Sequence, residues 1–467
     1  MLLAASPENE EHLHDRPGWV TPSPMNPSRR RFLADAASST AALAVGAALP
    51  GCSSTVNRVP STVNRPWTPP PIPADLPKDV RIVRAAFVTV AGKRPKFVGK
   101  NARLDDHGDH TGDHILRLWT NSGIAAFGTV HNVKEDAVRP LLGKSIAELV
   151  DPQNIFSDLH RPIDIALWDL LGKVAGRPAW RLLGGDFPTS GLQDSPTSRL
   201  PVYDGSLYFA DPLRPGKGAD AVAEEIEPAM NRGHRAFKLK IGRGQKWLTP
   251  WETGFKRDVE VIRACRKAAG KDATIMVDAN NGYVTDDGKP SLERVTALLD
   301  AVGDQQLTFI EEMFPEDVES YRHLSTVLRQ HGLRTVIADG ENMGRLEDPD
   351  PYLPGALIKH LQPDIRGWGL SLWWRLAKKA NIHHVLCTPH NWGSHLGHLV
   401  SLQLGRGIPN FGLAEQDTSE CDLFETEGWI LKHGRYSVPD RPGLGIGIRE
   451  NVYAKEYAGK EDWHISV

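Results

Sequence analysis

The runs AFKLKIG (236–242), TIMVDANN (274–281) and LTFIEEM (307–313) share one pattern, in which a short apolar stretch ends in polar residues. Amphipathic stretches of helical length lie between such runs, as in GADAVAEEIEPAMNRG (218–233) and SLERVTALLDAV (291–302). Strands and helices that alternate at this interval predict parallel strands joined by crossovers. Five further runs fit the pattern: LPVYDGS (200–206), TVIADGEN (335–342), LIKHLQPD (357–364), HHVLCTPHN (383–391) and FGLAEQD (411–417). Seven or eight such units predict an α/β fold built as a TIM-type barrel.

The alternative architecture is an open, doubly wound sheet. That fold usually carries a glycine-rich phosphate-binding turn after its first strand, and the sequence has no such turn there. GLGIG (443–447) comes too late in the chain for that role and is predicted to be a turn. The barrel is therefore favoured.

Polar residues gather at the carboxyl ends of the predicted strands. In a barrel these ends form one face, and that face holds the active site. Charges in a barrel mouth are costly unless they are paired or bound to a metal. The residues that should converge there are Lys238, Lys240, Asp278, Asn280, Glu311, Glu341, Asp364, His390 and Glu415.

The segment before the barrel has a different pattern. RIVRAAFVTVAG (81–92) and HILRLWTNSGIAAFGTV (114–130) are strand-like, and the apolar positions of RPIDIALWDLLGKVAG (161–176) recur at helical spacing. This indicates a smaller α+β domain beside the barrel. The predicted parts are an export signal (1–52), a linker (53–78), a capping domain (79–185), a barrel domain (186–425) and a C-terminal tail (426–467).

The composition of the 467 residues is that of an ordinary globular protein, with 40% apolar and 24% charged residues. A formal net charge of −3 gives no basic field that would hold nucleic acid. Cys52, Cys265, Cys387 and Cys421 are far apart and form no CxxC pair, so neither a disulfide framework nor a zinc ribbon is indicated.

The N-terminal region is typical of an export signal. Ser28-Arg-Arg-Arg-Phe-Leu33 precedes an alanine-rich apolar run that is too short for a good membrane span. Paired arginines before such a run predict export by the twin-arginine machinery, and the alternative is a general secretory signal. Translation could start at Met1 or at Met25, which lies just before the arginines.

The apolar run ends in Leu49-Pro-Gly-Cys52, which is similar to a lipoprotein processing box. Cys52 is therefore either a lipid anchor or a free cysteine that is removed with the signal. The following stretch repeats STVNR at 54–58 and 61–65 and then clusters prolines, which predicts an extended tether. We expect an exported protein, either periplasmic or tethered to a membrane.

Several motifs carry a family likeness. RPIDIALWDLLGKVAGRPAWRLLGG (161–185) resembles the signature ahead of the barrel in the mandelate racemase and muconate-lactonizing branch of the enolase superfamily, and KLK, VDANNGY, FIEE, GEN, QPD and TPH follow in that family's order. The resemblance covers roughly residues 80–450 and implies an α+β capping domain, a (β/α)7β barrel and a C-terminal tail that returns to the cap. Glu341 in GEN and the Asp364–His390 pair favour the mandelate racemase subgroup.

The resemblance implies that Asp278, Glu311 and Glu341 bind a metal. Three carboxylates with no thiol or imidazole form a hard oxygen site, which selects Mg²⁺ over zinc. The alternative is that these acids only pair with nearby lysines. Glu312 points to the opposite side of its strand from Glu311 and could pair with a lysine.

The resemblance also implies two groups that move protons. Lys240 is the first base, and the positive charge of Lys238 and of the metal on its side of the mouth should lower its pKa toward a useful range. His390 is the second base or acid, oriented by Asp364, although His395 and His398 lie nearby in the sequence. Glu415 corresponds to an acid on the eighth strand that could donate to the intermediate, or it could only hold the barrel end.

Substrate contacts are expected at Asn280, Tyr203 and Tyr208. DDHGDHTGDH (105–114) is expected in a flexible loop of the cap that covers the substrate, or as a weak metal site. The tryptophans that could either stack on a sugar or pack in the core are Trp368, Trp373, Trp374 and Trp392.

These residues predict an enzyme that removes the proton next to a substrate carboxylate. Dehydration of a sugar acid to a 2-keto-3-deoxy acid, in carbohydrate acid catabolism, is favoured. The alternatives are a racemase or epimerase and, in a different class, a non-catalytic exported binder of sugar acids. We expect a small carboxylate substrate, Mg²⁺ as cofactor and a homo-oligomer.

Overall fold

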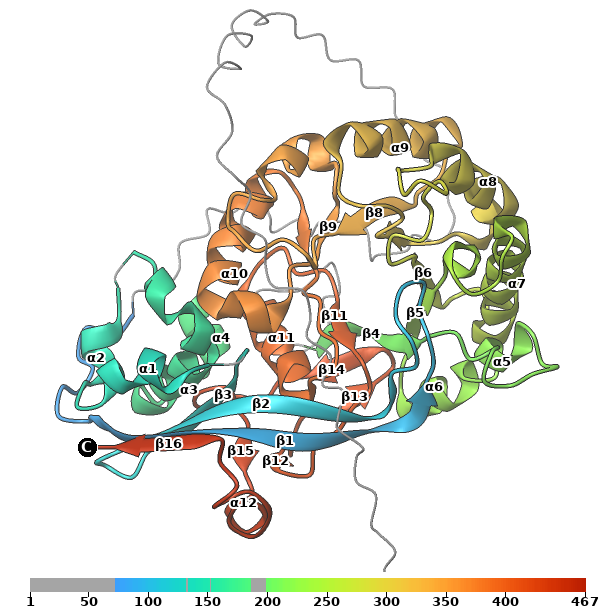
Figure 1. Cartoon of the computed structure of the whole chain (residues 1–467). Coiled ribbons are helices and arrows are strands. Elements are labelled where there is room, and N and C mark those ends of the chain that lie inside the picture. Colours follow the sequence, from blue (N-terminus) through green and yellow to red (C-terminus); the bar gives the residue numbers. More distant parts are fainter. Residues whose placement is uncertain (1–71, 132, 152, 186–198) are drawn as a thin grey trace, which may run out of the picture. The chain divides into compact units, whose positions relative to one another are not determined.

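The computed structural model describes residues 72–131, 133–151, 153–185 and 199–467 (Figure 1). The predicted export signal, including Cys52, and residues 53–71 of the predicted linker lie outside these ranges. Within the described ranges, no helix combines the length and the apolar character needed to cross a bilayer.

Eight parallel strands form a closed barrel, as the sequence predicted. Seven of them pair in sequence order, and the eighth, β11, pairs with the first, β4, so that Glu415 lies opposite Tyr203. A parallel bridge between Cys387 and Phe411 joins the last two strands and completes the ring. The strands are β4 (Arg199–Leu207), β5 (Ala236–Lys240), β6 (Thr274–Asp278), β7 (Phe309–Glu311), β8 (Val336–Asp339), β9 (His360–Leu361), β10 (Leu386–Cys387) and β11 (Ala414–Gln416).

Helices surround the barrel strands (Figure 1). They are α5 (Asp220–Ala223), α6 (Ile226–Arg232), α7 (Trp251–Ala269), α8 (Leu292–Val302), α9 (Val318–Gln330), α10 (Ile365–Ile382) and α11 (His395–Gly407). The stretch predicted as one helix over 218–233 is divided into α5 and α6. Between β8 and β9 the crossover contains two 3₁₀ turns, Asp350–Tyr352 and Pro354–Ala356, where the repeat would place a helix.

Helix α9 illustrates why these segments fold as they do. The carboxylate of Asp317 accepts a hydrogen bond from the backbone N–H of Ser320 at 2.7 Å and so caps the helix N-terminus. Its buried residues Tyr321, Leu324 and Leu328 recur every three or four positions and face the barrel.

Strand alternation brings the polar residues to the barrel mouth. A small core cluster inside the barrel comprises Tyr203, Ala236, Met276, Phe309, Ala338 and Leu413. Side chains two residues apart on a strand share a face. Asp278 therefore follows Met276 on the inner face of β6, and Glu311 follows Phe309 on that of β7. The apolar cluster closes the barrel below the site, and the charged residues lie above it.

The capping domain contains an antiparallel sheet in the order β16-β1-β2-β3. Its strands are β1 (Ile82–Val98), β2 (Gly108–Thr120), β3 (Ala125–Thr129) and β16 (Trp463–Ser466), so the last strand of the chain is part of the cap sheet. The remaining α-helices and strands of the described chain are α1 (Glu135–Val138), α2 (Ile146–Leu149), α3 (Asp164–Val174), α4 (Ala179–Leu183), β12 (Phe424–Glu425), β13 (Leu431–Lys432), β14 (Arg435–Ser437), β15 (Gly447–Ile448) and α12 (Glu450–Glu456). Of these, β14 pairs with β4 of the barrel and β13 with β14.

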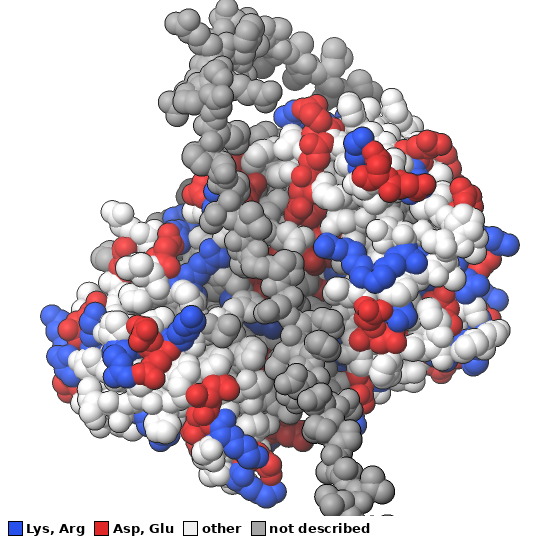
Figure 2. Space-filling model, viewed as in Figure 1, with Lys and Arg blue, Asp and Glu red and all other residues white. Residues whose placement is uncertain are grey.

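The cap is attached to the barrel through α3. The indole Nε1 of Trp168 donates to Oγ of Ser371 on α10 at 2.9 Å, and both side chains are buried. One expectation for the cap is wrong: most of 105–114 is not a loop, because strand β2 begins at Gly108. On the face shown in Figure 2, acidic and basic side chains are interspersed, in keeping with the small net charge.

Candidate active site

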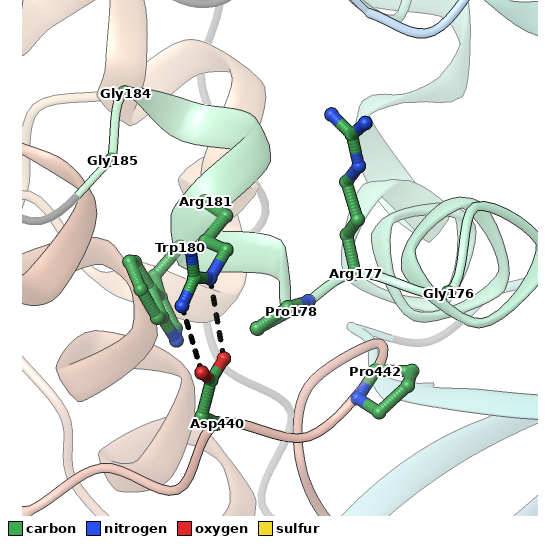
Figure 3. Close-up of a pocket in the computed structure, with 9 residues that line it drawn as sticks. All are labelled: Gly176, Arg177, Pro178, Trp180, Arg181, Gly184, Gly185, Asp440 and Pro442. Carbon is green, nitrogen blue, oxygen red and sulfur yellow. Dashed lines mark hydrogen bonds and ion pairs between the residues drawn. The ribbon is translucent and has the colours of Figure 1, made fainter.

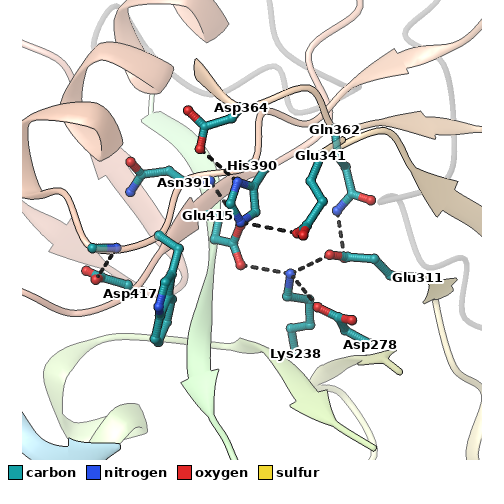
Figure 4. A network of polar contacts seen from close by, with 12 residues as sticks. Lys238, Asp278, Glu311, Glu341, Gln362, Asp364, His390, Asn391, Glu415 and Asp417 are labelled. Atoms are coloured by element: carbon teal, nitrogen blue, oxygen red, sulfur yellow. Dashed lines mark hydrogen bonds and ion pairs between the residues drawn. The ribbon is translucent and has the colours of Figure 1, made fainter. Parts of the chain in front are cut away.

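A buried lysine lies at the centre of the barrel mouth (Figure 4). The Nζ atom of Lys238 lies 2.7 Å from Oε1 of Glu311, 2.8 Å from Oε1 of Glu415 and 3.3 Å from Oδ2 of Asp278. Burial favours the neutral amine, but Glu311 and Glu415 outweigh it and hold the pKa of Lys238 well above its usual range. Lys238 is therefore a charged group that neutralises the carboxylates around it.

Lys240, two residues further on the same face of β5, forms an ion pair with Asp278. Burial favours its neutral form, but the adjacent carboxylate prevails and raises the pKa of Lys240 above its usual range. Lys238 lowers the pKa of Lys240, as the sequence predicted, but Asp278 outweighs it and the net shift is upward. The effect of the paired acid is larger than that of the second ammonium.

The pKa values of Asp278 and Glu311 are shifted in opposite directions by their buried charged neighbours. Burial opposes ionisation of Asp278, but Lys240 and Lys238 together hold the pKa of Asp278 well below its usual range. Burial outweighs the attraction of Lys238 at Glu311, and with Asp278 and Glu415 nearby it raises the pKa of Glu311 to about 8. The mouth therefore contains more buried carboxylate than its lysines neutralise.

His390 and Asp364 form the predicted pair on the other side of the mouth. Nδ1 of His390 lies 2.9 Å from Oδ2 of Asp364, while Nε2 lies 3.3 Å from Glu341 and 4.0 Å from Glu415. Burial lowers the pKa of His390, but Glu341 and then Asp364 outweigh it and raise it to about 9.

Asp364 is held in place by the start of helix α10. Its Oδ1 accepts hydrogen bonds from the backbone N–H groups of Arg366 at 2.9 Å and Gly367 at 3.1 Å. The two other histidines have different partners: Nδ1 of His395 accepts from the N–H of Cys421, and Nδ1 of His398 contacts the carbonyl of Glu415. His390 is therefore the histidine that faces the mouth.

The three predicted metal ligands lie on neighbouring strand ends but do not share one open point. Asp278 and Glu311 contact Lys238, and Glu341 contacts His390. In the described ranges no group of three histidine, cysteine, aspartate or glutamate side chains is arranged to hold a metal as it stands. The metal assignment remains a prediction, and it requires these ion pairs to open.

Glu312 differs from its prediction. Among the described residues it pairs with no lysine; its Oε2 accepts from the Asn280 amide at 3.0 Å and its Oε1 from the Asn342 amide at 2.8 Å. Burial and the nearby Glu341 carboxylate raise the pKa of Glu312 well above its usual range.

The predicted substrate contacts lie in different environments. Tyr203 is fully buried in the cluster inside the barrel, and Nζ of Lys238 lies 5.5 Å from its ring centroid, so Tyr203 packs against Lys238 from inside the barrel. Tyr208 lies beside Lys240, with Nζ 5.0 Å from its ring centroid. Asn280 is committed to Glu312 through its amide nitrogen.

His107, from the segment 105–114 that was expected to cover the substrate, and Trp392, a predicted sugar-stacking residue, both approach the mouth. His107, in the loop between β1 and β2, packs edge-on against Tyr208 at 4.8 Å between ring centroids, and Trp392 stacks on Tyr208 at 4.6 Å. Of the four tryptophans considered for sugar stacking, Trp368, Trp373 and Trp374 are buried in the core. Trp392 alone among these four is placed beside the site.

Other neighbours of the site were also missed. Nε2 of Gln362 donates to Oε2 of Glu311 at 2.6 Å, and strand alternation from the buried His360 could have indicated this residue. His131 from the cap has its Nε2 3.6 Å from Oδ1 of Asp364, a contact for which the sequence offers no signal.

A separate surface pocket lies away from this network (Figure 3). It is lined by Gly176, Arg177, Pro178, Trp180, Arg181, Gly184, Gly185, Asp440 and Pro442. An ion pair joins Arg181 and Asp440 across it at 2.8 Å, and both side chains are about half exposed. An exposed ion pair of this kind contributes little to stability. The pocket therefore differs from the barrel mouth, where the charged side chains are buried.

Comparison with known proteins agrees with this geometry. Residues 221–452 match the family model described as Enolase C-terminal domain-like. The chain is 29% identical over 286 residues to 3,6-anhydro-alpha-L-galactonate cycloisomerase of Streptomyces coelicolor, covering 61% of this chain and 68% of that protein. It is 28% identical to D-galactarolactone cycloisomerase of Agrobacterium fabrum, with 62% and 71% covered. It is 26% identical to arabinonate dehydratase of Saccharolobus solfataricus, with 64% and 71% covered.

Solved structures of related proteins match this chain over more of its length. A mutant galacturonate dehydratase from Geobacillus sp. in complex with Mg is 26% identical, with a TM-score of 0.77 over 85% of this chain and 100% of that one. A mandelate racemase/muconate lactonizing protein from Geobacillus sp. Y412MC10, complexed with magnesium/tartrate, is 28% identical, with a TM-score of 0.76 over 84% and 99%. The chain therefore belongs to the enolase superfamily, in its branch of mandelate racemase and muconate-lactonizing enzymes.

Proposed function

We propose that this enzyme removes the proton next to the carboxylate of a sugar acid and then eliminates water to give a 2-keto-3-deoxy acid. One observation carries the proposal: Lys240 and the His390–Asp364 pair stand on opposite sides of a carboxylate-rich mouth. Lys240 ends β5, and His390 follows β10. Strands β4 and β11 separate them on one side of the ring and β6 to β9 on the other.

The donor set fits a bound Mg²⁺. The buried or partly buried carboxylates at the mouth outnumber the two ammonium groups; they are Asp278, Glu311, Glu312, Glu341 and Glu415, against Lys238 and Lys240. In the described part of the chain, Asn280 Oδ1 and Gln362 Oε1 are also buried without a hydrogen-bond partner. An excess of hard oxygen donors suits a divalent cation of the Mg²⁺ type, and Asp278, Glu311 and Glu341 would hold it.

When bound, Mg²⁺ would offset negative charge on the substrate carboxylate and weaken the hold of Asp278 on Lys240. Neutral Lys240 then takes the C2 proton, and the electrons of the C2–H bond move toward the carboxylate. His390 gives a proton to the C3 hydroxyl, the C3–O bond breaks, and water leaves. The resulting enol becomes the 2-keto-3-deoxy acid, and Lys240 and His390 recover their proton states by exchange with solvent.

The choice of substrate class is supported by the relatives. Three relatives that are named arabinonate, xylonate and mannonate dehydratase are 26%, 25% and 26% identical to this chain. A racemase or epimerase is the second candidate, because an N-succinyl-L-Arg/Lys racemase is 25% identical over 233 residues. Two proton-transfer groups on opposite sides also suit that reaction.

We also propose that the enzyme is exported, on the strength of the arginine motif at 28–33 and the apolar run that follows it. Fusion of residues 1–78 to a reporter that works only after twin-arginine export tests this. Export that persists after Arg29→Lys and Arg30→Lys together would contradict the twin-arginine route.

The test of the reaction follows the C2 proton. The purified chain is incubated with Mg²⁺ and pooled sugar acids in D₂O, and proton NMR is recorded. Loss of the C2 signal with new 2-keto-3-deoxy resonances supports dehydration. Loss of that signal alone supports racemisation or epimerisation, and unchanged C2 protons in every pool would contradict both.

A further inference from the structure

Glu312 directly follows β7 and links the loops after the strands on either side, β6 and β8. Its Oε2 accepts from the side-chain amide of Asn280, after β6, at 3.0 Å. Its Oε1 accepts from the side-chain amide of Asn342, after β8, at 2.8 Å. Since β7 lies between β6 and β8 in the barrel, one carboxylate joins three consecutive strand ends.

These links lead directly to the predicted metal ligands. The backbone N–H of Asn280 donates to Oδ1 of Asp278 at 2.9 Å, and Asn342 directly follows Glu341. The backbone N–H of Asn281 donates to the carbonyl of Glu312 at 2.6 Å. A shift of the Glu312 carboxylate would therefore be transmitted to Asp278 on one side and Glu341 on the other.

The backbone at Glu312 has an unusual conformation. Its φ is +43°, and Asn280 opposite has a φ of +41°. Asparagine tolerates this left-handed region, whereas glutamate seldom adopts it, so the surrounding contacts must hold Glu312 there. The side chain is also almost wholly buried, and both of its oxygens are already occupied by amide donors.

We propose that Glu312 is a positioning residue, which sets the spacing between Asp278 and Glu341 and thereby the affinity for Mg²⁺. This rests on the proposed function only through the choice of the metal ligands. Replacement by glutamine keeps the shape but turns one acceptor oxygen into an NH₂ group that faces another amide donor. One of the two hydrogen bonds by which residue 312 links the strand ends should then be lost.

The test measures Mg²⁺ binding to the full chain by isothermal titration calorimetry. Glu312→Gln should bind Mg²⁺ roughly 10- to 100-fold more weakly, which is the usual effect of removing a group that orients a ligand. Its stoichiometry and far-UV circular dichroism should match the wild type. Glu311→Gln, which removes a predicted ligand, should lose more affinity than Glu312→Gln.

Two further variants separate positioning from charge. Glu319→Gln removes one negative charge on exposed α9 and should bind like the wild type. Glu312→Gln with Asn342→Asp has the wild-type net charge and gives the new NH₂ group an acceptor, so it should recover most of the affinity. The proposal is overturned if Glu312→Gln binds within twofold of the wild type, if the double variant shows no recovery, or if the wild type binds no Mg²⁺. Metal binding that follows these expectations supports the role of Glu312 even when no sugar acid reacts.

Discussion

The Nδ1 atom of His390 lies 2.9 Å from Oδ2 of Asp364, while the other oxygen of Asp364 caps the first turn of α10 through two backbone N–H groups. The aspartate thereby fixes both the start of a helix and the orientation of an imidazole ring. A change at Asp364 can therefore be designed to leave the helix intact while it alters the proton held by the ring.

Asp364→Asn should reduce dehydration by roughly 10²- to 10⁴-fold, because a neutral amide stabilises the imidazolium poorly and can select the wrong tautomer. The asparagine oxygen still caps α10, so the circular dichroism spectrum should not change. Exchange of the C2 proton with solvent should persist, since Lys240 is unaltered. Parallel loss of exchange and dehydration would contradict separate roles for the two groups.

Lys240→Gln should remove the first base. We expect C2-proton exchange to fall by at least roughly 10²-fold, because general base catalysis contributes about that much or more. Lys238 still lies 3.3 Å from Asp278, so the acid keeps one ammonium partner and the barrel should stay folded. Proton NMR in D₂O gives the rate, and exchange near the wild-type level would rule out Lys240 as the base.

The sequence was sufficient for the elements whose signal is local. The position of Asp278 and Glu311 at the ends of apolar runs predicted that they meet at the barrel mouth, and the structure places them there above Met276 and Phe309. The partners of Glu312 were not predictable in this way, since they depend on how loops from three strands meet. The contact of His131 with Asp364 likewise depends on how the cap docks, which periodicity in either segment does not encode.

The direction of the pKa shift of Lys240 also could not be predicted from the sequence. The sequence revealed a second lysine two residues away, which would lower the pKa of Lys240. Its actual partner, Asp278, comes from the next strand at the matching register position. Burial and ion pairing of this kind arise only after the strands are aligned, so the sign of the shift was not available from spacing alone.

Arg94 and Asp417 should contribute strongly to the attachment of the cap. Their side chains are almost fully buried, with Nη2 of Arg94 3.1 Å from Oδ2 of Asp417. Arg94→Met leaves a buried carboxylate without its cation and should destabilise the fold by about 3–5 kcal/mol. Denaturant unfolding measures the loss, and Asp417→Asn in the same chain should restore part of it. Asp417→Asn alone completes the cycle, and a double variant whose loss equals the sum of the two single losses would show that the pair contributes no coupling.

Asp164 gives a prediction on stability and pH, far from the predicted metal ligands. This carboxyl begins α3 and accepts the N–H of Ser371 at 3.1 Å; its burial raises the pKa of Asp164 from 3.8 to about 6. The folded state therefore binds more protons than the unfolded state between these values, so this group lowers stability as pH rises from about 4 to 6. Asp164→Asn removes the titration, and its free energy of unfolding relative to the wild type should rise by about 2 kcal/mol from pH 4 to pH 7. Urea unfolding of both proteins across this range measures the difference. A constant difference would contradict the assignment, because any fixed change in packing or hydrogen bonding does not vary with pH.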